Sequence, residues 1–146
     1  MLSKSKVLIV AIFVLFLIVG VWICRRTIMM NENHSKIVLV KELHKAVSMM
    51  MADLRSAKAS SISDVPTDGQ WYHAVTFSTS QEGPINYNIE GDKIKRLYKK
   101  ESYLVASRIG GLNLRRAPGQ DSMLEVQIQA KDNLSLTTNF KVRLQE

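Results

Sequence analysis

The residue types that most often carry chemistry are present in this chain, but their spacing forms no catalytic group. The three histidines, His34, His44 and His73, stand ten or more residues apart, whereas histidines that bind zinc recur at short spacings. The chain has no Gly-rich phosphate loop, no Gly-x-Ser-x-Gly and no His-Glu-x-x-His. These patterns predict a protein that is not an enzyme and that holds no metal and no cofactor.

The acidic residues and the single cysteine are the remaining candidates for a metal or redox site. Asp64, Asp68, Asp92 and Asp121 fall in predicted loops at wide spacings, where lone acids more often cap turns than bind calcium. Cys24 has no second cysteine to pair with, so the chain can form no internal disulfide and no Cys-based metal cluster. We interpret Cys24 as an apolar residue at the edge of a membrane span.

Basic residues gather in one part of the sequence. Between Lys93 and Arg116 there are eight basic residues against one acid, Glu101. With Tyr98 and Tyr103 interleaved, this stretch could pair with DNA phosphates and stack on bases, or contact acidic headgroups or an acidic partner. We favour a solvated strand edge whose lysines discourage aggregation, and do not expect a nucleic-acid partner. The candidate patch comprises Lys93, Lys95, Arg96, Lys99, Lys100, Arg108, Arg115 and Arg116.

The first element of the chain is a candidate membrane span. Val7 to Cys24 is a run of 18 residues without a charge, and a helix of that length covers roughly 27 Å, close to the thickness of the bilayer's hydrocarbon core. A secretory signal would end in small residues at its cleavage site, but bulky Trp22 and Ile23 come before Cys24 and Arg25 follows it. We therefore expect the span to be retained as an anchor in the lipid bilayer.

A second helical segment follows the span. Apolar residues recur at steps of three and four from residue 37, while Lys41, Lys45 and Arg55 fall on the other face. Asn31 to His34 are weaker helix formers, so a local break is an alternative to one continuous helix. The predicted buried stripe, which packs on a sheet, is Leu39, Leu43, Val47, Met50 and Leu54.

The rest of the chain reads as strands. Ile85 to Ile89 alternates apolar and polar residues, and after Gly91-Asp92 the stretch Lys93 to Tyr98 completes a hairpin. Leu124 to Ile128 and Leu134 to Leu144 form a second hairpin with one apolar face and a turn at Lys131 to Asn133. Tyr103 to Leu114 is either a short helix or an irregular strand. An N-terminal helix covering an antiparallel β-sheet of about four or five strands is an α+β fold. The predicted divisions are a basic tail at 1–6, a transmembrane helix at 7–24, its amphipathic continuation at 25–59 and the sheet domain at 60–146.

Several stretches resemble the type IV pilin-like proteins, most of all the larger minor pseudopilins of type II secretion. They are Asp53-Leu54-Arg55-Ser56-Ala57, Ile85 to Ile89 with Lys95-Arg96-Leu97, Leu104 to Leu112, and Leu136 to Arg143. The resemblance implies an N-terminal helix whose first half sits in the inner membrane and whose second half packs on a sheet. It also implies a soluble domain in the periplasm and partners that are other pilin-like subunits.

The start of the chain departs from that family's pattern. Members carry a basic leader ending in Gly, then an aromatic residue and a Glu at the fifth position of the mature chain. Here no Gly precedes the span, and no acid occurs before Glu32. We therefore expect the first residues to remain attached. The alternatives left open are a divergent, uncleaved pilin-like subunit, a permanently anchored subunit of another bacterial envelope complex, and a DNA-binding minor pilin.

The charges that flank the span leave its orientation open. Lys4, Lys6 and the amino terminus precede the span, while Arg25 and Arg26 follow it. Because cations stand on both sides, the positive-inside rule does not choose between the two orientations.

Overall fold

The computed structural model describes residues 4–79, 83–131 and 136–146, with side chains from residue 12 onward. The chain divides into two compact units, Met1–Val38 and Leu39–Glu146. The first unit is helical, and the second combines the end of the same helix with all of the strands.

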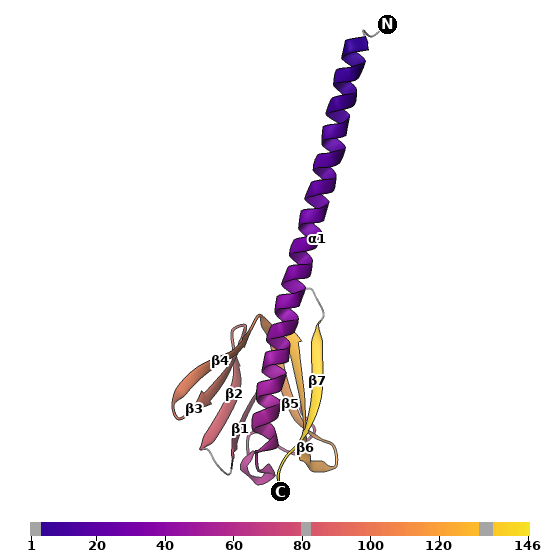
Figure 1. Cartoon of the computed structure of the whole chain (residues 1–146). Helices are drawn as coiled ribbons and strands as arrows, with labels where there is room; N and C mark the ends of the chain where they lie inside the picture. Colours follow the sequence, from indigo (N-terminus) through magenta and orange to yellow (C-terminus); the bar gives the residue numbers. More distant parts are fainter. Residues whose placement is uncertain (1–3, 80–82, 132–135) are drawn as a thin grey trace. The chain divides into compact units, whose positions relative to one another are not determined.

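One uninterrupted helix, α1 (Lys4–Arg55), contributes to both units (Figure 1). The local break considered at Asn31 to His34 is absent. The helix ends at Arg55, before the predicted boundary at residue 59, and a short 3₁₀ turn, η1 (Ala59–Ser61), follows. At this end the Ser56 hydroxyl donates to the Asp53 carbonyl at 2.7 Å, a bond from side chain to backbone that competes with helix propagation.

The described residues form seven strands in two antiparallel sheets, where the sequence predicted a single sheet of about four or five strands. The α+β class and the antiparallel pairing are confirmed, and the number of strands and sheets was wrong. The first sheet has the order β1-β2-β3-β4 and the second the order β5-β6-β7. The strands are β1 (Ala74–Ser78), β2 (Pro84–Glu90), β3 (Lys93–Tyr98), β4 (Glu101–Ser107), β5 (Ile109–Ala117), β6 (Gln120–Ala130) and β7 (Thr137–Arg143).

Two tight hairpins build the first sheet beyond β1. Strands β2 and β3 join through Gly91-Asp92, as predicted, and Gly91 has a φ of 64°, which glycine adopts without steric cost. Strands β3 and β4 join through Lys99 and Lys100, whose φ values are 49° and 68°. Two positive φ angles define a type I′ turn, which normally selects Asn or Gly. The sequence therefore carried no turn signal for this second hairpin.

The ambiguous stretch from Tyr103 to Leu114 is two strands that belong to different sheets. The chain leaves β4 at Ser107, passes Arg108 with a φ of 61°, and enters β5 at Ile109. A Cβ on Gly110 would lie 2.9 Å from the carbonyl oxygen of Ala130, so this corner needs a glycine.

The C-terminal hairpin pairs β6 with β7. Val126 stands opposite Phe140, and Leu124 stands opposite Val142, consistent with the predicted apolar face. Of the turn predicted at Lys131 to Asn133, only Lys131 lies within the described residues, and Leu134 also lies outside them.

A single core joins the end of α1 to both sheets. The two sheets connect where Tyr72 and Leu114 exchange backbone hydrogen bonds of 2.8 Å in both directions. From the predicted stripe, Leu39, Leu43, Met50 and Leu54 are buried in this core, while Val47 is partly buried and packs against it. Ala46, which the sequence placed beside Val47, is the fully buried neighbour instead.

Candidate interaction surfaces

The N-terminal unit exposes apolar side chains around the whole helix. The large apolar residues described between Ile12 and Ile23 are 45 to 72% exposed. Among the described residues α1 is the one helix long and apolar enough to cross a membrane. At the end of the apolar run the guanidinium of Arg26 lies 5.3 Å from the centre of the Trp22 ring. Such a pairing of an aromatic ring with a cation suits a membrane interface.

Apolar exposure continues beyond the two arginines that close this run. Ile28, Met29, Met30 and Ile37 are 55 to 66% exposed, although the segment between them contains Asn31, Glu32 and Asn33. Large apolar side chains on a helix in water are normally buried against a neighbouring element. This segment therefore suits contact with another apolar helix.

A polar cluster fixes the last turn of α1 to the first sheet. The Tyr87 hydroxyl donates to Asp53 Oδ2 at 2.7 Å, and Arg96 Nε donates to the same oxygen at 2.6 Å. Burial, followed by this bond to Asp53, raises the pKa of Tyr87 far above its ordinary value. Burial opposes the charge on Arg96, but the contributions of Asp53 and Tyr87 together outweigh burial and raise the pKa of that guanidinium. The cluster positions the helix on β2 and β3.

Arg116 does not belong to a surface patch, because its side chain is buried. Its guanidinium donates to the backbone carbonyls of Ala59, Ile62 and Val65 at 2.9 to 3.1 Å, and also to that of Asp121. Burial lowers its pKa from the ordinary value. Arg116 therefore cross-links the segment after α1 to the second sheet, a role that the sequence did not indicate.

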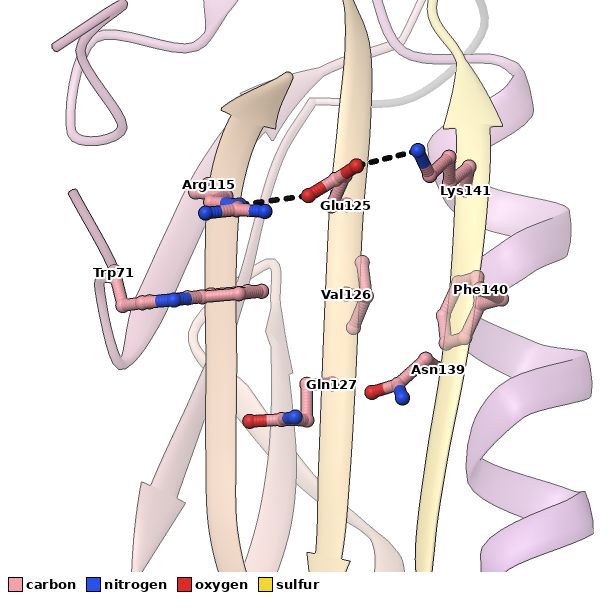
Figure 2. A pocket seen from close by; sticks show the side chains of 8 residues that line it. All are labelled: Trp71, Arg115, Glu125, Val126, Gln127, Asn139, Phe140 and Lys141. Atoms are coloured by element: carbon pink, nitrogen blue, oxygen red, sulfur yellow. Dashed lines mark hydrogen bonds and ion pairs between the residues drawn. The ribbon is translucent and has the colours of Figure 1, made fainter. Parts of the chain in front are cut away.

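Arg115 points to the outer face of the second sheet, where three strands and Trp71 form a shallow hollow of about 390 Å³ (Figure 2). Glu125 accepts from Arg115 at 2.6 Å and from Lys141 at 2.6 Å. The Arg115 guanidinium also lies 4.4 Å from the centre of the Trp71 ring. The bond from Lys141, and then that from Arg115, lower the pKa of Glu125 below its ordinary value. Because all three charges are paired, we interpret this row as a cross-strand ladder that stabilises the sheet.

The remaining members of the predicted basic patch are scattered. Lys93 is exposed at the start of β3, Lys95 forms an ion pair with Glu90, and Arg108 occupies the corner between the sheets. Only Lys99 and Lys100 share one turn. The eight residues therefore do not form a continuous basic surface, because β3 and β5 lie in different sheets and Arg96 and Arg116 are committed to structural bonds.

The described residues contain no group of three His, Cys, Asp or Glu side chains that could hold a metal ion. The three histidines are exposed, and His73 Nδ1 lies 3.1 Å from the Leu112 carbonyl. Asp68 accepts from the Tyr72 hydroxyl at 2.6 Å and from the Gln70 amide at 2.9 Å. The Tyr72 bond is the main cause of its lowered pKa. Asp68 thus supports a turn, as the sequence predicted.

Comparison with known proteins gives no relative for this chain. No family model, no curated protein and no solved structure matches it.

Proposed function

We propose that this chain is a non-enzymatic structural subunit of a pilus-type or pseudopilus-type assembly machine, anchored in a bacterial inner membrane with its sheet domain in the periplasm. In this role the apolar part of α1 holds the subunit in the bilayer and then packs against the corresponding helices of other subunits. The sheet domain selects the neighbours.

The observation that carries this proposal is the uninterrupted α1. Its described residues from Ile12 to Ile23 expose apolar side chains, whereas Leu39, Met50 and Leu54 of the same helix are fully buried in the second unit. A protein that is only anchored can join its membrane helix to its domain through a linker, and the membrane helix need not continue as a core helix of the domain. A shared helix suits a subunit whose domain must follow the helix into an assembly.

A permanently anchored subunit of another envelope complex is the second candidate. The absence of an acid before Glu32 and of a Gly before the span favours it, because the pilin-like family uses both features. The DNA-binding alternative is weakened by Arg96 and Arg116, which are bonded to Asp53 and to buried carbonyls rather than presented to phosphates.

Fractionation of native cells distinguishes the two structural candidates. Fibres are released by shear from cells that overproduce the machine. We expect a fraction of the molecules of this protein to leave the membrane together with other single-span subunits of the released extracellular or periplasmic fibres. A chain that stays wholly with the membrane, while the fibre subunits are released, would favour the permanently anchored complex.

A further inference from the structure

The residues that the structure describes cover only half of the outer edge of the first sheet. Strand β4 is the last strand of that sheet. At its C-terminal end the Ser107 amide donates to Glu42 Oε2 of α1 at 2.9 Å, so the helix caps this half of the edge. Glu101, Ser102, Tyr103 and Leu104 are all exposed. An uncovered edge strand is a template for pairing with another chain.

The register indicates which backbone groups face outward. Tyr98 stands opposite Glu101 across the two-residue turn, and Leu97 stands opposite Ser102. In a two-residue hairpin the closing pair is hydrogen bonded, and hydrogen-bonded pairs alternate with pairs whose N–H and C=O groups point away from each other. Ser102 and Leu104 therefore turn their backbone groups toward the open edge.

The surface beside this edge is apolar. Leu104 is 54% exposed and Tyr103 is 45% exposed, and both line a groove of about 440 Å³ with Met49 of α1. Edges that avoid pairing carry charged side chains on the strand itself. On β4 only Glu101, beside the turn, is charged, and its carboxylate accepts from the Tyr103 hydroxyl. Ser102, Tyr103 and Leu104 carry no charge.

The charge around the groove identifies the kind of partner. Lys45 and Lys100 are exposed, and neither has an ion-pair partner within the described parts of the chain. Asp53 lines the groove and is bonded to Arg96, and Glu101 at the start of β4 accepts from the Tyr103 hydroxyl. A second copy of this chain, with a net charge of +7, would add cations to this rim. An acidic partner complements it.

We propose that β4 is a docking edge that accepts an extended, acidic segment of a different protein as a fifth strand of the first sheet. The added strand would pair with the outward groups of Ser102 and Leu104, place alternate apolar side chains against Met49 and Tyr103, and set acids at its two ends near Lys45 and Lys100. This inference rests on the proposed role as an assembly subunit and assigns one of its partner contacts.

The test uses the purified full-length chain in phospholipid nanodiscs and a fluorescein-labelled nine-residue peptide, in which five residues that alternate Val and Thr are flanked by two Glu at each end. The control peptide has Lys in place of every Glu. Ser102→Pro removes an outward N–H and blocks an added strand with its ring, while Ser102→Ala at the same position leaves the backbone donor in place. A second variant, Lys45→Glu with Lys100→Glu, reverses the charge and keeps the backbone.

Fluorescence anisotropy should show binding of the Glu peptide and at least tenfold weaker binding of the Lys peptide. Ser102→Pro should weaken the Glu peptide about tenfold and Ser102→Ala less than twofold, since one main-chain bond and the strand's close approach are lost. The charge-reversed variant should exchange the preference of the two peptides.

Two results would overturn the proposal. One is equal binding of both peptides, or undiminished binding to both Ser102→Pro and the charge-reversed variant. The other is self-association of the full-length chain in sedimentation that Ser102→Pro abolishes, which would assign the edge to a second copy. The binding test uses purified protein, so a negative result refutes the docking edge without refuting the proposed function. The proposed function is tested by the release of the protein with fibres.

Discussion

Leu54→Ala tests whether the end of α1 is part of the domain core. Leu54 is fully buried at the last turn of the helix, next to the Asp53 cluster and within a core that includes residues of both sheets. The alternative is that the stripe serves as a seam between subunits. In that case its truncation would weaken association and leave the single domain as stable as before.

The expected loss follows from the burial of this side chain. Replacing Leu with Ala removes the equivalent of about three methylene groups, worth roughly 2.4 kcal/mol of transfer free energy at ~0.8 kcal/mol each. The cavity that remains adds to this cost, and measured values for buried leucines are about 2 to 5 kcal/mol. A loss of about 3 kcal/mol is a large part of the roughly 5 to 15 kcal/mol that stabilises a domain.

The assay is urea unfolding of the full chain in detergent micelles, followed by Trp71 fluorescence in a Trp22→Phe background. Trp71 lies on the second sheet, so its signal reports the domain rather than the apolar helix. Val40→Ala is the matched control, because Val40 is on the same helix but 51% exposed. We expect it to change stability by less than about 0.5 kcal/mol.

The same loss should appear at every protein concentration. A Leu54→Ala variant whose unfolding midpoint matches that of Val40→Ala, or whose loss disappears on dilution, would refute the packing of this helix in the core.

Four further predictions concern the polar bonds, the charges and the N-terminus. Arg116→Met should destabilise the domain by several kcal/mol, since buried acceptors left unpaired cost roughly 1 to 3 kcal/mol each. Hydrogen exchange should show that residues 59–65 lose protection first. Arg116→Lys should recover part of the lost stability. The depressed pKa of Glu125 means that its contribution to stability is complete above the ordinary value of 4.5 and is lost as the pH falls through the lower folded value. Glu125→Gln should therefore be less stable at pH 7 and lose less stability than the native chain on acidification from pH ~4.5 to ~3; parallel pH profiles would contradict this. Lys93→Glu should leave fibre assembly unchanged, and the native chain should not retain duplex DNA at physiological salt in a filter-binding titration. Intact-mass measurement on protein extracted from native membranes should give the full-length chain, and a mass lacking the N-terminal residues would contradict retention of the start.

The helix and the hairpins with strong local signals were predictable from the sequence. The stripe from Leu39 to Leu54 repeats at helical spacing, and Gly91 marks the β2–β3 turn, so local chemistry was sufficient in both places. The β3–β4 turn was missed because Lys99 and Lys100 adopt left-handed angles that lysine rarely takes. Without that turn, the stretch containing β4 and β5 could not be divided between two sheets.

The structural roles of Arg96 and Arg116 were not predictable from the sequence for a different reason. Charge density along a sequence does not tell which cations are buried, and burial depends on contacts far apart in the chain. Arg96 meets Asp53 across 43 positions, and Arg116 meets Ala59 across 57. The open edge at Ser102 to Leu104 was equally invisible, because it exists only once the order of the strands is known.

Photo-crosslinking from Phe16 in living cells tests the central claim most directly. Phe16 is 72% exposed on the apolar part of α1, and a benzoylphenylalanine at this position reports whatever packs against the helix. The proposed function predicts an adduct with a second single-span subunit, in which the linked residue lies in that subunit's own N-terminal apolar helix. Adducts with lipid alone, or only with proteins that cross the membrane many times, would contradict a pilin-like subunit.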